Sequence, residues 1–86
     1  MNKIIIYSIE NCPYCDELKK LLINENIEFI DINVLLDENK AEYDKISKKT
    51  KTDVVPIIKV GKQLLVPNIS FDTIQEGFDL TKKFLI

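Results

Sequence analysis

The spacing of apolar and polar residues along the chain predicts alternating strands and helices. Lys3–Ser8 is a continuous isoleucine-rich run, typical of a central strand that is buried on both faces. From Pro13 to about Glu25, apolar residues recur at helical spacing, and Asn26 can adopt the left-handed conformation that ends a helix. Ile27–Val34 alternates apolar with polar residues, as a half-buried strand does. A strand, a helix and a strand in this order form a βαβ unit, in which the strands are parallel and the crossover is right-handed.

The second half of the chain predicts a helix, two strands and a final helix. Asp37–Thr50 is polar with a narrow apolar stripe of Ala41, Tyr43 and Ile46, and we expect a helix there. Pro56–Val60 and Gln63–Val66 are predicted to be strands joined by a tight turn at Gly61–Lys62. Ser70 is expected to cap the last helix. The apolar face of that helix is expected to contain Phe71, Ile74, Phe78 and Leu85.

No repeat, linker or low-complexity segment interrupts this pattern, so we expect one domain that spans residues 1–86. A chain of this length hides roughly 60% of its unfolded surface on folding and has no room for a second core. Its composition, 45% hydrophobic and 30% charged, is that of a soluble globular protein. The expected fold class is therefore α/β, with the element order βαβαββα.

Several kinds of chemistry are excluded by residues that the chain lacks. Its two glycines, Gly61 and Gly77, are too far apart for a phosphate-binding loop or a dinucleotide fingerprint. The absence of histidine excludes histidine-based triads, and two cysteines alone cannot complete a four-ligand zinc site. We therefore expect no metal bound by one chain, and the chemistry that remains is that of two cysteine sulfurs.

Charge and hydropathy indicate which partners to expect. With 12 basic and 14 acidic residues the net charge is −2, so there is no basic field to hold nucleic acid. Lys48, Lys49 and Lys51 form a local cluster, which is either a solvated helix end or a site that steers an acidic partner. The apolar run near the N-terminus is too short for a signal peptide or a membrane span. We therefore expect a protein of the reducing cytoplasm, where a Cys-x-x-Cys pair is more often catalytic or metal-binding than a structural staple.

The two cysteines lie in Cys12-Pro13-Tyr14-Cys15, between the first strand and the first helix. Pro13 is favoured at the first helical position, because its missing N–H would have no partner there in any case. Cys12 is then the N-cap and Cys15 the third helical residue, and side chains at these positions approach closely enough for a disulfide. We expect Cys12, exposed at the helix tip, to attack a substrate disulfide, and Cys15, one turn further in, to resolve the mixed disulfide.

The start of the helix is also expected to make Cys12 acidic, because unpaired N–H groups and the positive end of the helix favour a thiolate. Lowering a thiol pKa from about 8.5 to about 7 takes roughly 2 kcal/mol. A helix end supplies about 0.3–1 kcal/mol of this, so N–H donation to the sulfur must supply the rest. Asp16 and Glu17 oppose the shift, so we expect a moderate one. The competing interpretations are that both cysteines are small core residues, or that they bind a metal, either within one chain or in a cluster shared by two chains.

These residues resemble the glutaredoxins, small members of the thioredoxin-fold superfamily. Cys12-Pro13-Tyr14-Cys15 is identical to the dithiol glutaredoxin motif and follows a first strand, as in the family. Val54-Val55-Pro56 stands where the family has Thr-Val-Pro, whose proline is cis and lies against the active-site sulfurs. The resemblance covers nearly the whole chain and implies a thioredoxin fold, with a four-stranded mixed sheet flanked by helices.

The resemblance also implies the activity. It implies a thiol–disulfide oxidoreductase that reduces protein or glutathione mixed disulfides, with glutathione as co-substrate and no bound cofactor. A cis proline turns the N–H and C=O of the residue before it toward a peptide or glutathione backbone. A trans proline that merely starts an edge strand is the alternative. The residues implied are catalytic Cys12 and Cys15, supporting Pro13, and substrate-binding Tyr14, Val55 and Pro56.

The sequence departs from the family where the charges of glutathione are held. Ile9 occupies the position of a lysine that meets a glutathione carboxylate. The family's Gly-Gly is replaced within Leu65-Val66-Pro67, and its Cys-Asp pair has no clear counterpart in Asn68-Ile69-Ser70-Phe71-Asp72. Losing these partners would weaken glutathione binding by about 1–3 kcal/mol per charged hydrogen bond. A thioredoxin-reductase-like flavoenzyme is therefore the alternative reductant.

Two other functions remain open. One is a redox-inactive module that docks partners in the groove around Val55 and Pro56, which the intact Cys-x-x-Cys pair opposes. The other is a dimer that holds an iron–sulfur cluster with Cys12 and glutathione, which the rigid Pro13 and the altered glutathione positions oppose. The expected protein is a cytoplasmic monomer that transfers electrons to disulfide-containing proteins and maintains the redox balance of the cell.

Overall fold

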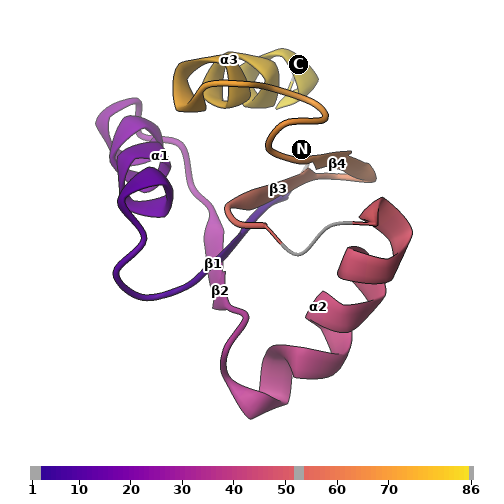
Figure 1. The fold of residues 1–86 in the computed structure, drawn as a ribbon. Coiled ribbons are helices and arrows are strands. Elements are labelled where there is room, and N and C mark those ends of the chain that lie inside the picture. The colour runs from indigo at the N-terminus through magenta and orange to yellow at the C-terminus, as the bar shows by residue number, and fades with distance from the viewer. Residues whose placement is uncertain (1–2, 52–53, 86) are drawn as a thin grey trace.

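The structure is a computed structural model that describes residues 3–51 and 54–85. Its elements follow the order predicted from the sequence, βαβαββα (Figure 1). They are β1 Ile4–Ser8, α1 Pro13–Asn24, β2 Ile30–Asn33, α2 Asp37–Thr50, β3 Ile57–Val60, β4 Gln63–Leu65 and α3 Ile74–Leu85.

The strands of the described residues form one mixed four-stranded sheet in the order β2-β1-β3-β4. β1 pairs in parallel with β2 and antiparallel with β3, and β3 pairs antiparallel with β4. The central position predicted for the first strand is confirmed, because Ile6 is paired on both sides, with Asp31 and with Ile58. The loop that follows β1 therefore begins at the middle of the sheet.

Helices cover both faces of this sheet, with α1 and α3 together on one face and α2 on the other (Figure 1). Side chains alternate along a strand, so Ile6 and Ile58 face α1 and α3, whereas Tyr7 and Ile57 face α2. The first set is the α1/α3 core, made of Ile4, Ile6, Leu18, Leu22, Ile58, Val60, Leu65, Phe71, Ile74 and Phe78. The second set is the α2 core, made of Tyr7, Val34, Ile46, Ile57 and Val66.

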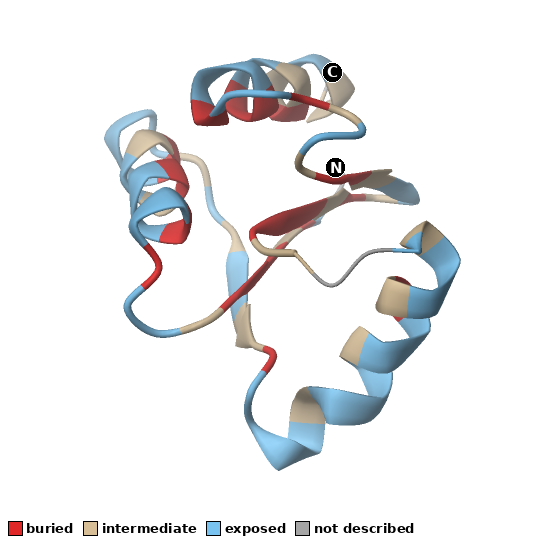
Figure 2. Cartoon of the chain, viewed as in Figure 1, coloured by how far each residue is buried: buried red, intermediate tan, exposed pale blue. Residues whose placement is uncertain are grey.

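The narrow apolar stripe predicted for α2 is confirmed at Tyr43 and Ile46 and is wrong at Ala41. Ile46 is its buried residue, Tyr43 packs half-buried against the α2 core, and Ala41 is exposed. Most of the helix surface is open to solvent (Figure 2). The position of α2 therefore depends on few side chains.

The strand predicted at Ile27–Val34 is present only over Ile30–Asn33. Asn26 has a φ of 58°, which confirms the left-handed stop, and the N–H of Ile27 donates to the Leu22 carbonyl at 2.9 Å. Ile27 thus completes the C-terminal cap of α1 and does not start the strand. β2 forms an edge of the sheet.

The cap predicted at Ser70 is wrong, because α3 begins at Ile74. The N–H of Glu76 donates to Thr73 Oγ1, and the N–H of Thr73 donates to Glu76 Oε1, both at 3.1 Å. This reciprocal pair is a capping box. The Ser70 hydroxyl instead accepts a hydrogen bond from the N–H of Val66 at 3.0 Å and so closes the loop between β4 and α3.

Phe71 consequently enters the α1/α3 core from this loop and not from the face of α3, where the sequence pattern placed it. Its ring lies against Gly77, where an added Cβ would be 3.0–3.1 Å from the ring carbons. The absence of a side chain at Gly77 therefore allows this close approach. Ile74, Phe78 and Leu85 do lie on α3 and pack in the α1/α3 core, as predicted.

Candidate active site

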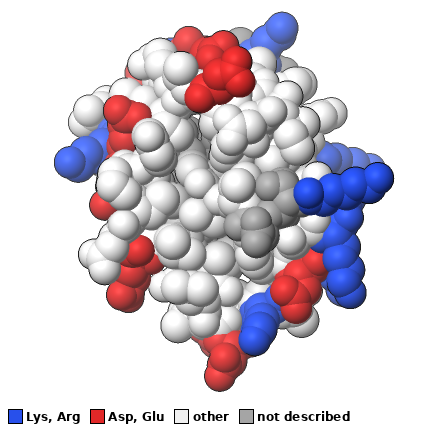
Figure 3. Space-filling view, in the orientation of Figure 1, with Lys and Arg blue, Asp and Glu red and all other residues white. Residues whose placement is uncertain are grey.

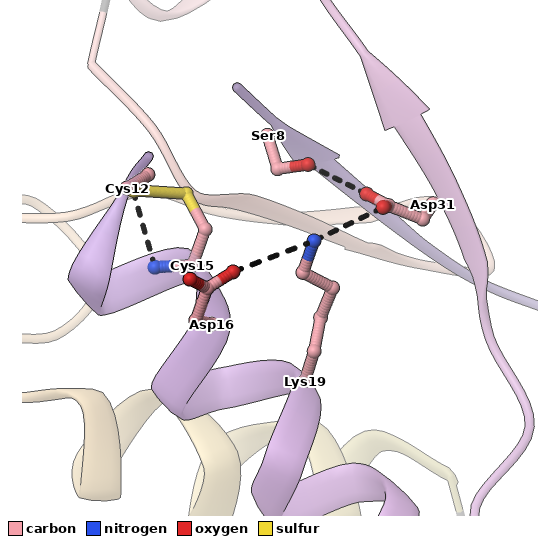
Figure 4. Close-up of polar contacts among 6 residues, drawn as sticks. All are labelled: Ser8, Cys12, Cys15, Asp16, Lys19 and Asp31. Atoms are coloured by element: carbon pink, nitrogen blue, oxygen red, sulfur yellow. Dashed lines mark hydrogen bonds and ion pairs between the residues drawn. A yellow bond between two sulfur atoms is a disulfide. The ribbon is translucent and has the colours of Figure 1, made fainter. Parts of the chain in front are cut away.

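The start of α1 has the geometry predicted for a helix capped by cysteine. Cys12 is the N-cap, with φ −106° and ψ 104°, and Pro13 follows at the first helical position. The N–H of Cys15 donates a hydrogen bond to Cys12 Sγ at 3.2 Å. The two cysteines are joined in a disulfide, with their Cα atoms 5.2 Å apart (Figure 4). A backbone donor to the Cys12 sulfur is the contact that a lowered thiol pKa requires.

The expectation that Cys12 is exposed is wrong for this disulfide form. Only 7% of Cys12 is exposed, and Cys15 is fully buried. The Cys12 sulfur is bonded to the buried Cys15 sulfur and accepts the N–H of the same residue, which turns it toward the first helical turn. The order of accessibility agrees with the prediction, since Cys12 is the outer sulfur and Cys15 the inner one.

Pro13 and Tyr14, the residues between the cysteines, are both exposed. Tyr14 keeps 65% of its surface open to solvent, although it lies within the first turn of α1. An exposed aromatic ring next to a disulfide offers apolar contact area to a molecule that approaches the sulfurs.

Val55 and Pro56 lie between α2 and β3, and the peptide bond between them is cis, as the resemblance implied. Pro56 is buried and Val55 half-buried. Because Tyr7 of β1 pairs antiparallel with Ile57 of β3, Pro56 stands level with Ser8, the last residue of β1. The sheet register thus brings Val55 and Pro56 next to the C-terminal end of β1, where the loop to Cys12 begins. Thr52 and Asp53, just before this segment, lie outside the described residues.

A chain of polar contacts runs beside the disulfide (Figure 4). Lys19 Nζ lies 3.9 Å from Asp16 Oδ1 and 3.0 Å from Asp31 Oδ2. The Ser8 hydroxyl donates to Asp31 Oδ1 at 2.6 Å. The negative charge expected to oppose the Cys12 thiolate is therefore partly balanced by a lysine on the same helix.

Sequence reasoning missed this chain of contacts, although one signal was present. Asp16 and Lys19 have the i, i+3 spacing that brings opposite charges together on a helix. Asp31 could be placed only from the parallel register, which sets it beside Ile6 of β1, from where its carboxylate reaches the Ser8 hydroxyl. These groups border a shallow pocket of about 350 Å³ formed by the loop after β1, the start of α1 and the end of β2.

Two tyrosine hydroxyls connect α2 to the rest of the site, and neither of these hydrogen bonds was predicted from the sequence. The Tyr7 hydroxyl donates to Glu42 Oε2 at 2.7 Å, and the Tyr43 hydroxyl donates to the Val54 carbonyl at 3.3 Å. Burial, the hydrogen bond to Glu42 and the charge of Glu42 raise the pKa of Tyr7 well above its usual value, so Tyr7 remains a donor. Tyr43 connects α2 directly to the segment that contains the cis peptide bond.

Two of the residues at which the sequence departs from the glutathione-binding pattern are apolar and packed. Ile9 is half-buried against the α2 core, and Val66 belongs to that core. Among the described residues seen in Figure 3, the charged side chains gather at the margin of this face. Among the helices of residues 3–51 and 54–85, none is long and apolar enough to cross a membrane.

Two cysteines that close a disulfide across the first turn of a helix, next to the central strand of a helix-covered sheet, define a dithiol–disulfide redox protein. The sequence model of the family described as Glutaredoxin matches residues 4–65. The chain belongs to the glutaredoxin family, and it is a thiol–disulfide oxidoreductase.

Curated relatives agree with this assignment. An uncharacterized glutaredoxin-like 8.6 kDa protein in the rubredoxin operon of Clostridium pasteurianum is 35% identical over 63 residues, which cover 73% of this chain and 81% of that protein. Glutaredoxin 3 of Escherichia coli is 32% identical over 63 residues, which cover 73% of this chain and 74% of that protein.

Solved structures confirm the thioredoxin fold. The complex of buckwheat glutaredoxin with glutathione superposes with a TM-score of 0.72 at 17% identity, covering 95% of this chain and 70% of that one. A dithiolic glutaredoxin of Trypanosoma brucei brucei gives a TM-score of 0.71 at 23% identity, covering 95% of this chain and 79% of that one. The mixed sheet flanked by helices is thus the one that the sequence resemblance implied.

Proposed function

We propose that Cys12 is the attacking nucleophile and Cys15 the resolving cysteine of this oxidoreductase. The Cys12 thiolate attacks one sulfur of a substrate disulfide, forms a mixed disulfide and releases the other substrate sulfur as a thiolate. The Cys15 thiolate then attacks Cys12 Sγ, releases the second substrate thiolate and forms the Cys12–Cys15 disulfide. Two electrons pass from the protein dithiol to the substrate.

The observation that carries this proposal is the hydrogen bond from the Cys15 N–H to Cys12 Sγ at the N-terminus of α1. In the reduced protein the same donor and the helix dipole favour the Cys12 thiolate. Cys15 is fully buried, so it is poorly placed to meet a large substrate first and well placed to attack Cys12. The outer sulfur therefore starts the exchange and the inner sulfur completes it.

The substrate backbone is proposed to lie along Val55 and Pro56, with Tyr14 beside it. Half-buried Val55 offers backbone groups for pairing, and exposed Tyr14 offers an aromatic surface. Glutathione is the proposed co-substrate, an inference supported by the glutathione complex of the buckwheat protein. Two glutathione thiols would reduce the Cys12–Cys15 disulfide and leave as one glutathione disulfide.

The apolar side chains at Ile9 and Val66 offer no charge to the carboxylates of glutathione. The main substrates are therefore proposed to be disulfide-containing proteins, and a thioredoxin-reductase-like flavoenzyme is the alternative reductant. Turnover with glutathione and glutathione reductase, compared with turnover with thioredoxin reductase, separates the two reductants. Strong turnover with glutathione would contradict the weak glutathione binding inferred from these two positions.

Two cysteine variants test the division of roles. Cys15→Ser is expected to remain joined to a protein substrate through Cys12, and mass spectrometry of the complex measures this. Cys12→Ser is expected to lose disulfide exchange altogether. Retention of full activity by Cys12→Ser, with Cys15→Ser inactive and unlinked, would reverse the two roles.

The wider role follows from this chemistry. We propose that residues 1–86 act as one monomeric domain in the cytoplasm, where the protein transfers electrons to protein disulfides and helps to maintain the thiol balance of the cell. Size-exclusion chromatography with light scattering tests the monomer, and fractionation of cells that produce the protein tests its location.

A further inference from the structure

The α2 helix carries a hydroxyl that bonds directly to the segment proposed to pair with substrate. Tyr43 Oη donates to the carbonyl oxygen of Val54 at 3.3 Å. Tyr43, Val54 and Val55 all pack half-buried against the α2 core. The contact therefore joins a helix of the scaffold to the residue that precedes the pairing position.

The geometry of the peptide unit explains how this hydrogen bond can affect the Val55 N–H. The Val54 carbonyl and the Val55 N–H belong to the same peptide unit, which is planar and, unlike the next one, trans. The two groups point in opposite directions within that plane. A donor that holds the Val54 carbonyl therefore also sets the direction of the Val55 N–H.

As far as the described residues go, the Val55 N–H is available to a substrate. Within residues 3–51 and 54–85, no group accepts a hydrogen bond from it. A hydrogen bond accepted by the carbonyl of an amide also polarises the N–H of that amide and strengthens it as a donor. Tyr43 would thus orient the Val55 N–H and also make it a stronger hydrogen-bond donor.

We propose that Tyr43 is a positioning residue for substrate binding: from α2, its hydroxyl fixes the Val54–Val55 peptide plane and presents the Val55 N–H to a backbone carbonyl of a peptide or glutathione disulfide. This inference rests on the proposed pairing of substrate at Val55. Tyr43 itself touches neither the substrate nor the sulfurs. Its effect is on substrate binding, and the reactivity of Cys12 is independent of it.

The Tyr43→Phe variant tests the proposal, because it removes the hydroxyl and keeps the ring that packs against the α2 core. The prereduced protein is mixed with a glutathione–cysteine mixed disulfide in a single turnover, so the outcome does not depend on which reductant serves in the cell. The half-saturating concentration is expected to rise about threefold to tenfold, the factor that corresponds to the net free energy of one hydrogen bond. The limiting rate and the pH profile of Cys12 alkylation are expected to stay as in the wild type.

Thr81→Val is the matched control, because it removes a buried hydroxyl that donates to the Gly77 carbonyl at 2.8 Å on α3. This variant is expected to keep the wild-type half-saturating concentration. An unchanged value in Tyr43→Phe, or a fall in the limiting rate alone, would overturn the positioning role. A rise of the same size in Thr81→Val would also overturn it, since the effect would then be one of general destabilisation.

A binding measurement separates failure of this inference from failure of the proposed pairing. S-methylglutathione cannot exchange disulfides, and its addition to reduced, ¹⁵N-labelled protein is expected to shift the Val55 amide resonance. If that resonance does not move in the wild type, pairing at Val55 is wrong. If it moves over the same concentration range in the wild type and in Tyr43→Phe, the pairing stands and the role of Tyr43 is refuted.

Discussion

The buried hydroxyl of Tyr7 makes a stability measurement at alkaline pH informative. Tyr7 is 1% exposed in the α2 core and donates to Glu42 Oε2 at 2.7 Å. Tyr7→Phe removes this hydrogen bond and leaves the ring in place. Near pH 8 we expect the free energy of unfolding to fall by about 1–2 kcal/mol, the low end for a hydrogen bond to a charged group, because Glu42 is exposed.

The pH dependence follows from the raised pKa of Tyr7. In the unfolded chain the phenol ionises near its usual pKa of 10.0, whereas in the folded protein burial and Glu42 hold the pKa of Tyr7 above that value. The stabilisation is therefore fully present below about pH 10 and is lost as the pH rises above it, because only the unfolded chain then releases the proton. At pH 11 the wild type is expected to have lost about 1.4 kcal/mol through this group.

Urea unfolding followed by circular dichroism measures this loss, with wild type and Tyr7→Phe compared at pH 8, 10 and 11. The disulfide form is used, so that no cysteine titrates. The two proteins differ only in the Tyr7 hydroxyl, so the difference between them isolates the contribution of this group. The difference between the two proteins is expected to shrink from about 1–2 kcal/mol at pH 8 to near zero at pH 11. A difference that stays constant over this range would show that folding does not hold Tyr7 protonated.

Two further predictions concern α1 and α3. Lys19→Met is expected to slow alkylation of reduced Cys12 at pH 6 by about twofold to fivefold, because two carboxylates near the sulfurs lose their partner. Lys20→Met removes the same charge from an exposed position of α1, and equal rates in both variants would contradict the role of Lys19. Gly77→Ala is expected to lower the free energy of unfolding by about 1 kcal/mol, because the clash with the Phe71 ring outweighs the gain in helix propensity. In a Phe71→Leu background the same change is expected to stabilise the protein, and thermal unfolding measures both.

The parts of the fold that could be predicted are those governed by local pattern. The isoleucine run of β1 indicates a strand buried on both faces, and Pro13 between the cysteines indicates a helix start. Both indications depend on neighbouring residues alone. The errors arose where two local signals compete, as at the start of α3, where Ser70 and Thr73 can each cap a helix. The nearby Glu76 favours Thr73 as the N-cap, because it completes the reciprocal pair of hydrogen bonds.

The candidate site was predictable only where its residues adjoin in sequence. The cysteine pair and the proline segment are short motifs, and they were found. The contacts of Asp31 with Lys19, and of Tyr43 with Val54, depend on the sheet register and on how α2 lies across the sheet. A hydrophobic pattern shows which face of a helix is buried, but it does not show which hydroxyl reaches which carbonyl.

The division of the interior into two cores has a consequence for how this protein can change. The dithiol is carried by α1, which is anchored by Leu18 and Leu22 in the α1/α3 core, whereas Val54 and Val55 pack against the α2 core on the other side of the sheet. Substitutions that repack one side therefore leave the other side largely undisturbed. On the substrate pairing proposed at Val55, variation confined to α2 and its underlying side chains would retune which disulfides are accepted, while the sulfur pair keeps its reactivity.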